Sequence, residues 1–292
     1  MNVKLSFIRL ISRIQPTSVE YTKGRFHAAT IRSRLQKSFK LVKLLLIGSH
    51  PRKSAIKKHS DVDLLAVFSR SEARWGDTLK SSSTFLNNIR DDLRERFWQT
   101  EISRDKQAVV VSFGAGEFSV DVVPSVFWGI DEKRRPIYLI PDGEGDWMET
   151  SPEQHARHIV QEDERSGGKL KRTAQLIKFF RECRSPRIPL SSFHIELLLS
   201  EYEICLGARS YSQCITNVFK TLIRRECRGI RDPLGISGII GAVKSETQRE
   251  SALRSVEYAY DHASRALAAE GVGNHEEACR QWNIVFNGNF PH

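Results

Sequence analysis

The apolar positions of this chain follow two different patterns, and the change between them falls near residue 150. Before that point, short apolar runs bounded by turn residues alternate with stretches of helical periodicity, which predicts strands mixed with helices. The predicted strands are 41–47, 62–68, 107–113, 117–123 and 137–140, and the predicted helices are 1–14, 17–40 and 76–97. A hairpin turn is expected at 114–116, and the strand after it is expected to end at Pro124.

After residue 150 the pattern is helical throughout. Pro152 follows Thr150 and Ser151 and marks a helix start, because proline is favoured in the first turn of a helix. Further helices are predicted at 169–183, 191–206, 210–227, 245–270 and 273–286. The sequence therefore predicts an α+β fold, with a mixed lobe of strands and helices at 1–150 and a helical lobe at 151–292.

Carboxylates interrupt two of the predicted strands. Asp61 and Asp63 are two positions apart, so their side chains point to one face, with Cα atoms roughly 6.5–7 Å apart. Like charges on an apolar strand are costly unless a cation neutralises them. If strand 117–123 lies beside strand 62–68, at about 4.8 Å, Asp121 joins the pair. Three such carboxylates can hold two Mg²⁺ ions for phosphoryl transfer, although each aspartate alone also suits an ordinary strand end or turn.

A Gly-Ser pair follows the first predicted strand. Gly48 allows a phosphate to approach the backbone closely, and Ser49 supplies a hydroxyl and an N–H. Pro51 is placed to open a short helix whose N-terminus would attract anions. Alone, a Gly-Ser pair is a common turn; eleven residues before Asp-x-Asp, it predicts a phosphate-binding turn. The loop between them is expected to be solvated, with phosphate contact as the alternative, and contains Arg52, Lys53, Lys57 and Lys58.

Composition narrows the classes of function. The chain has 292 residues and a formal net charge of +10, which fits polyphosphate or nucleic-acid partners as well as simple solubility. Its five cysteines are an odd number without tight spacing, so neither disulfides nor a zinc knuckle is expected. No apolar run approaches the length of a membrane span. We expect a cytoplasmic protein that does not engage a membrane.

Gly-Ser, a gap, Asp-x-Asp on a strand and a later strand aspartate resemble the signature of the DNA polymerase β-like nucleotidyltransferases. Within that superfamily, the chain is similar to the cGAS/DncV-like nucleotidyltransferases (CD-NTases) of bacterial CBASS anti-phage systems. The narrower resemblance is carried by four later segments, at 138–155, 168–196, 232–233 and 282–291. It implies a polymerase β-like catalytic core at 1–150 and a helical lobe at 151–292 that closes the nucleotide cleft.

The resemblance also implies an activity and roles for particular residues. The enzyme would join nucleoside triphosphates into a cyclic di- or oligonucleotide, a second messenger that activates a downstream effector. Two Mg²⁺ ions, or Mn²⁺ in their place, would be held by Asp61, Asp63 and Asp121. The donor triphosphate would be held by Gly48, Ser49, Lys178 and Ser192, and Phe193 would stack on a base. Alternatives stay open: a solvated basic face for Lys178, a helix cap for Ser192 (or Ser191), and a core position for Phe193.

Two other functions stay open at this stage. A related enzyme would transfer one nucleotide to tRNA, a protein or a small molecule. A catalytically silent RNA- or nucleotide-binding module would act through its basic surface, although it would not need three carboxylates. The zinc-binding cluster of the animal DNA-sensing relatives has no counterpart in the cysteine and histidine spacing, so zinc-dependent DNA sensing is not expected. We expect a monomer.

Overall fold

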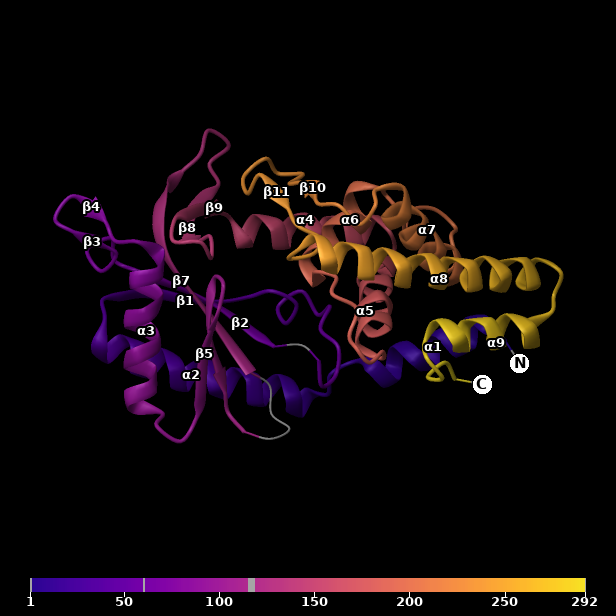
Figure 1. Ribbon diagram of the computed structural model, residues 1–292, viewed down its shortest axis with the longest axis horizontal. Coiled ribbons are helices and arrows are strands. Elements are labelled where there is room, and N and C mark those ends of the chain that lie inside the picture. The colour runs from indigo at the N-terminus through magenta and orange to yellow at the C-terminus, as the bar shows by residue number, and fades with distance from the viewer. Residues whose placement is uncertain (1, 60, 115–118, 292) are drawn as a thin grey trace. The chain divides into compact units, whose positions relative to one another are not determined.

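The computed structural model describes residues 2–59, 61–114 and 119–291, which form two compact units. One unit is Pro16–Arg157, and the other combines Met1–Gln15 with His158–His292 (Figure 1). The N-terminal helix thus belongs to the helical unit by its contacts, and the roles predicted for 1–150 and 151–292 stay predictions. In these described ranges, no helix is both long and apolar enough to cross a membrane.

The first unit is built on a mixed sheet. Its strands are β1 (Leu41–Ile47), β2 (Val62–Phe68), β3 (Arg74–Trp75), β4 (Thr78–Leu79), β5 (Glu101–Asp105), β6 (Ala108–Ser112), β7 (Ser119–Ile130), β8 (Pro136–Pro141) and β9 (Trp147–Thr150). In the described part of the chain, seven of these form one sheet in the order β1-β2-β7-β6-β5, which β8 and β9 extend from β7. Strands β2 and β7 are parallel and the other neighbours are antiparallel, which confirms the predicted α+β class.

The two faces of β2 have different neighbours, because strand side chains alternate. Leu64, Ala66 and Phe68 pack in the main core with residues of α2 (Ser18–Ser38) and α3 (Ser82–Arg96) (Figure 1). Leu65 and Val67 belong to a second cluster, on the other face, with residues of β1 and β8. Asp63 has the same parity as Leu65, so its carboxylate lies on the face that α2 and α3 do not cover.

Several element predictions are confirmed and several are wrong. Strands 41–47 and 62–68 are β1 and β2 with the predicted bounds. The predicted helix 76–97 begins too early, because β3 and β4 form a short hairpin and α3 starts after its cap, Ser81. Strands β5 and β9 were not predicted, and most of the expected turn at 114–116 lies outside the described residues.

The prediction that a strand ends at Pro124 is wrong, since β7 continues to Ile130. Proline has no N–H to give to a neighbouring strand, and it is tolerated where a ladder is interrupted. On one side of β7 the partner changes along its length: β6 pairs as far as Val122, and β8 pairs from Val126. Pro124 lies in the gap between these two ladders, where a missing N–H costs least.

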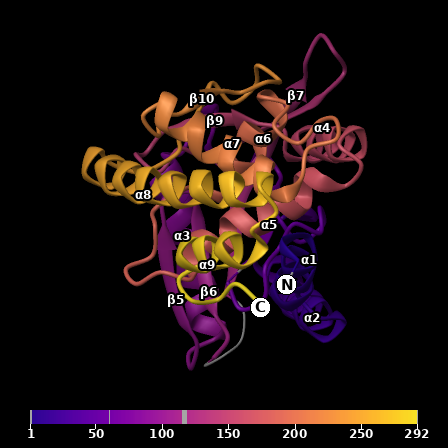
Figure 2. The ribbon, with the colours of Figure 1, turned by 90° about the vertical axis from the view of Figure 1, so that its right-hand side faces the viewer.

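The second unit is helical. Its elements are α1 (Val3–Ile14), α5 (Lys169–Glu182), α6 (Ser192–Glu201), α7 (Tyr211–Arg224), α8 (Glu246–Gly271) and α9 (His275–Val285), with a small pair of strands, β10 (Ile230–Arg231) and β11 (Ile239–Ile240). Helix α4 (Pro152–Arg165) begins in the first unit and ends in the second, and it starts at Pro152 as predicted. Helices α8 and α9 lie side by side (Figures 1 and 2).

Aromatic packing joins the first helix to the C-terminal segment of the same unit. The ring of Phe7, on α1, meets Trp282 edge-on with centroids 5.1 Å apart. It meets Phe290 in the same way at 4.8 Å. Phe7 and Trp282 are both buried. The burial of these large rings explains why the predicted N-terminal helix, far from the others in sequence, packs within the helical unit.

Candidate active site

The aspartates singled out in the sequence lie where β1 ends and where β2 and β7 begin. In the parallel ladder Asp63 is paired with Asp121. In the antiparallel ladder Asp63 is paired with Ile47, the last residue of β1. Neighbouring strands lie about 4.8 Å apart, so Asp63 and Asp121 are close neighbours on one face of the sheet. The predicted adjacency of the two aspartate-bearing strands is confirmed.

Gly48 follows β1 and lies against the carboxylate of Asp63. Its φ of +69° is in the left-handed region, where residues with a side chain are strained. A Cβ at this position would lie 1.8 Å from Asp63 Oδ2 and 2.6 Å from Cγ. Only glycine leaves room for this carboxylate, so the Gly-Ser turn and Asp63 form one compact arrangement.

The chain after Gly48 is a tight loop. The Ser54 N–H donates to the Ser49 carbonyl at 3.0 Å, and the Lys53 N–H donates to the His50 carbonyl at 3.1 Å. Residues 48–53 form successive turns, so the prediction that Pro51 opens a helix is wrong. An anion beside Ser49 would therefore meet the N–H groups of a turn and not those of a helix N-terminus.

The loop packs against α2. The buried His50 ring meets Tyr21 edge-on, with centroids 5.3 Å apart. Arg52 is only 7% exposed, so the expectation of a solvated loop is wrong for this residue, whereas Lys53 and Lys58 are exposed. A cavity of about 340 Å³ lies beside the loop, and Tyr21, His50 and Lys53 are among the residues that line it.

Asp61 lies just before β2 and is exposed. Its Oδ1 accepts a hydrogen bond from the hydroxyl of Ser119, the first residue of β7. Ser119 was missed in the sequence, although a signal was present: Ser119 and Asp121 are two positions apart in an apolar strand, with the same parity as Asp61 and Asp63. The structure thus places four polar side chains at adjoining strand ends.

These residues fit a divalent cation by their donor chemistry. Mg²⁺ prefers carboxylate oxygens, and Asp63 and Asp121 present a pair of carboxylates in register beside a glycine that makes room for one of them. Among the residues that the structure describes, no group of three or more His, Cys, Asp or Glu side chains is already arranged to hold a metal ion. Asp63 and Asp121, paired in the ladder, form the core of the candidate metal site, and Asp61 lies one row further along the same face.

Lys178 lies on α5, in the helical unit, and is only 2% exposed. Its Nζ forms an ion pair with Glu196 of α6, which is also buried. The alternative in which Lys178 belongs to a solvated basic face is therefore wrong. An ammonium group has three donors, so a phosphate at Lys178 would share this group with Glu196.

Ser192 and Phe193, which were predicted to contact the nucleotide, lie at the N-terminus of α6, and both are partly exposed. Ser191 is the helix cap, and its hydroxyl accepts from the His194 N–H at 3.3 Å. Ser192 is the first helical residue, so the alternative in which Ser192 itself caps the helix is wrong. Phe193 follows it, partly exposed and not fully in the core.

His194, the next residue on α6, is fully buried. Desolvation lowers its pKa to about 4, and the nearby positive charge of Arg225 acts in the same direction, while a backbone hydrogen bond to Arg228 opposes them. The imidazole is therefore neutral at pH 7. It supports the packing of α6 and contributes no charge beside Ser192 and Phe193.

Asp232, in the segment 232–233 that resembles the CD-NTases, has a structural role. Its carboxylate accepts from the N–H groups of Leu234 at 3.0 Å, Ile236 at 3.0 Å and Ser237 at 2.8 Å. The side chain is 2% exposed. These bonds organise the loop before β11, which is the behaviour of a turn aspartate.

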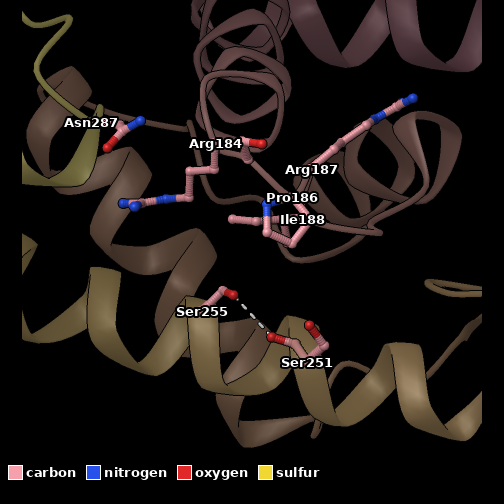
Figure 3. A pocket seen from close by; sticks show the side chains of 8 residues that line it. Arg184, Pro186, Arg187, Ile188, Ser251, Ser255 and Asn287 are labelled. Atoms are coloured by element: carbon pink, nitrogen blue, oxygen red, sulfur yellow. Dashed lines mark hydrogen bonds between the residues drawn. The ribbon is translucent and has the colours of Figure 1, made fainter.

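A cavity of about 240 Å³ in the helical unit is lined by residues 184–188, α8 and Asn287 (Figure 3). The side chains of Arg184 and Arg187 extend in different directions from it (Figure 3). Arg184 donates to the Val285 carbonyl at 2.8 Å, and Arg187 pairs with Glu182 at 2.8 Å. Both cations are bound to groups of the protein, and no predicted site residue lines this cavity.

All five cysteines are free thiols in the structure. Burial raises the pKa of Cys183 and of Cys227 to about 11. A thiol with such a pKa is protonated and unreactive at neutral pH. These two cysteines therefore have no place in the candidate chemistry.

Comparison with known proteins agrees with the geometry. The family model described as Second Messenger Oligonucleotide or Dinucleotide Synthetase domain (SMODS) matches residues 1–162. A probable cyclic nucleotide synthase of Bacillus cereus strain VD146 is 23% identical over 270 residues, which are 84% of this chain and 81% of that protein. The resemblance thus extends beyond the strand motifs into the helical unit.

Solved structures share the whole fold. Escherichia coli MS115-1 CdnC with ATP has a TM-score of 0.74 at 18% identity, covering 99% of each chain. Elizabethkingia meningoseptica CdnE cyclic dinucleotide synthase, with GTP and Apcpp, has a TM-score of 0.65 at 18% identity, covering 89% of this chain and 98% of that one. These likenesses confirm the predicted polymerase β-like fold with a helical lobe. Because the family model spans more than half of the residues, this chain belongs to the SMODS family, the Second Messenger Oligonucleotide or Dinucleotide Synthetase domains, and is a cGAS/DncV-like nucleotidyltransferase.

Proposed function

We propose that this chain is a Mg²⁺-dependent synthase that joins nucleoside triphosphates into a cyclic di- or oligonucleotide and releases pyrophosphate. The observation that carries the proposal is the in-register pair of Asp63 and Asp121, with Gly48 packed against the first of them. Membership of the SMODS family supports the reaction class. The matched relatives named as cyclic nucleotide synthases support the nature of the product.

The residues of the first unit divide the chemistry among them. Two Mg²⁺ ions, or Mn²⁺ in their place, held by Asp61, Asp63 and Asp121, would activate the attacking hydroxyl and neutralise charge on the leaving pyrophosphate. Asp121 accepts the proton of the acceptor hydroxyl while the oxygen of that hydroxyl forms a bond to the α-phosphorus. Gly48 and Ser49 hold the triphosphate through backbone N–H groups and a hydroxyl, while the bond from the α-phosphorus to pyrophosphate breaks.

The helical unit would supply the remaining nucleotide contacts. Ser192 is the first residue of α6, where the positive end of the helix dipole favours phosphate. Lys178 lies on the neighbouring α5, where its ammonium group forms a buried ion pair with Glu196. Phe193 offers a partly exposed ring for stacking on a base.

We propose that the product is a second messenger of a CBASS anti-phage system and acts by activating a downstream effector. The resemblance to the CD-NTases and the SMODS description support this role. We propose further that the enzyme works as a monomer in the cytoplasm.

The experiment uses the purified full chain with all four labelled nucleoside triphosphates and Mg²⁺ or Mn²⁺. We expect pyrophosphate release and a labelled product that resists phosphatase, because a cyclic product has no terminal phosphate. Asp63→Asn should remove both signals. Label found instead on tRNA, a protein or a small molecule in a lysate would favour single-nucleotide transfer. Absence of turnover with all substrates would contradict the proposal and favour a silent binding module.

A further inference from the structure

We propose that Ser119 is a positioning residue that orients the carboxylate of Asp61 for divalent-metal binding. The inference rests on the proposed function, since it concerns the same metal site. Nothing in the sequence motif of that site includes this serine. The hydroxyl of Ser119, at the start of β7, donates to Asp61 Oδ1, just before β2.

The geometry comes from the parallel ladder between β2 and β7. Asp63 is paired with Asp121, and Val62 is paired with Val120. Continuing this register by one residue places Asp61 opposite Ser119. With alternating side chains, one row on this face is Asp63 with Asp121, and the next row is Asp61 with Ser119. Ser119 thus lies on the same face of the sheet as the three candidate metal ligands, across from Asp61 and two residues before Asp121.

Asp61 needs a partner more than the other two aspartates do. It lies before the first residue of β2 and is exposed, so the strand ladder and the core do not restrain its side chain. A carboxylate has two oxygens, and a hydrogen bond to Oδ1 leaves Oδ2 able to bind a cation. Hydrogen bonds to ligating carboxylates orient them, and losing one typically weakens metal binding about 10- to 100-fold.

The same strand provides a matched control. Ser125, six residues further along β7 with the same parity, donates its hydroxyl to the Ala66 carbonyl at 3.2 Å. Ser125→Ala and Ser119→Ala therefore each remove one serine hydrogen bond from β7. Only Ser119 bonds a candidate metal ligand, so only Ser119→Ala should alter metal binding.

The experiment measures Mn²⁺ binding to the full chain without nucleotide, by electron paramagnetic resonance of free Mn²⁺. We expect Ser119→Ala to raise the dissociation constant about 10- to 100-fold. Ser119→Thr keeps the hydroxyl and should stay within a few-fold of wild type, as should Ser125→Ala. Thermal unfolding of each variant establishes that it is folded. In turnover, Ser119→Ala should raise the Mg²⁺ concentration for half-maximal rate, with a smaller change in rate at saturating Mg²⁺.

The outcomes separate this inference from the proposed function. If Asp63→Asn weakens Mn²⁺ binding and Ser119→Ala does not, the role of Ser119 is overturned while the metal site stands. If wild type binds Mn²⁺ and Asp63→Asn binds it equally well, the metal site itself is overturned, and the inference with it. Weakened binding in Ser119→Ala with recovery in Ser119→Thr supports the inference.

Discussion

A Cβ on Gly48 would lie 1.8 Å from Oδ2 of Asp63, so the turn after β1 and the carboxylate on β2 share a space that no side chain can enter. The register of the two strands produces this contact, because Ile47 is paired with Asp63 and Gly48 comes next. The glycine that would approach a phosphate is therefore also the residue that makes room for a candidate metal ligand. Two parts of the site depend on one missing side chain.

Gly48→Ala should abolish synthase activity, with a loss of at least about 100-fold, because the new methyl group displaces the Asp63 carboxylate by more than an ångström. Gly76 is the matched control: its φ is +60°, and nothing lies within 4 Å of an added Cβ. Both substitutions cost about 1–2 kcal/mol of stability through left-handed strain. Full activity in Gly48→Ala, measured by pyrophosphate release, would contradict the assignment.

The buried ion pair of the helical unit predicts non-additive stability. Lys178→Met should lower the free energy of unfolding by about 3–5 kcal/mol, because Glu196 then stays buried without this cation. The double variant Lys178→Met/Glu196→Gln should lose less than the sum of the single variants in chemical denaturation.

The control for Lys178→Met lies on the same helix, α5. Lys171 pairs with Asp163 at 3.0 Å, but its side chain is 26% exposed. Asp163 is buried, but it also accepts from the Lys171 backbone N–H at 2.8 Å, a bond that Lys171→Met keeps. Lys171→Met should therefore cost less than Lys178→Met, since water reaches the Lys171 side chain and one partner of Asp163 remains. Strict additivity for Lys178 and Glu196 would show that the two groups do not depend on each other.

The packing of Phe7 predicts that the N-terminal helix stabilises the helical unit. Phe7→Ala should cost about 3–5 kcal/mol, because it leaves a cavity against Trp282 and Phe290. Leu5 is on the same helix and is 52% exposed, so Leu5→Ala should change stability by about 0.5 kcal/mol or less. Equal effects of the two substitutions on the denaturation midpoint would contradict this packing.

His194 predicts a loss of stability in acid. Its folded-state pKa of about 4 lies below the ordinary 6.5, so the unfolded chain binds a proton between these values and the folded chain does not. The stability that His194 contributes is complete above pH 6.5 and is lost as pH falls toward 4. At pH 5 the loss should be about 2 kcal/mol. Between pH 8 and pH 5, the free energy of unfolding of His194→Gln should fall by about 2 kcal/mol less than that of wild type. An equal fall in the two proteins would refute the role of His194.

The sequence predicted the site best where local pattern determines structure. Strands β1 and β2 are apolar runs bounded by turns, and both have the predicted bounds. The parity of Asp63 and Asp121 needed only the adjacency of their strands to bring them together, and the ladder confirms that adjacency. The roles of these aspartates in metal binding stay predictions.

Features that depend on distant partners were missed. Ser119 acquires a role only through the register that places it beside Asp61. A solvated basic face stayed open as the alternative for Lys178 because its partner, Glu196, is on another helix. The pairings of Ser119 with Asp61 and of Lys178 with Glu196 join residues far apart in the sequence, so they depend on tertiary packing.

The most direct test is mass spectrometry of the nucleotide products formed from all four nucleoside triphosphates and Mg²⁺, by wild type and by folded Asp121→Asn. The account predicts that wild type forms a compound with the mass of two or more joined nucleoside monophosphates closed into a ring, and that Asp121→Asn forms none. A wild-type reaction without any such compound, or its undiminished formation by Asp121→Asn, would contradict the account.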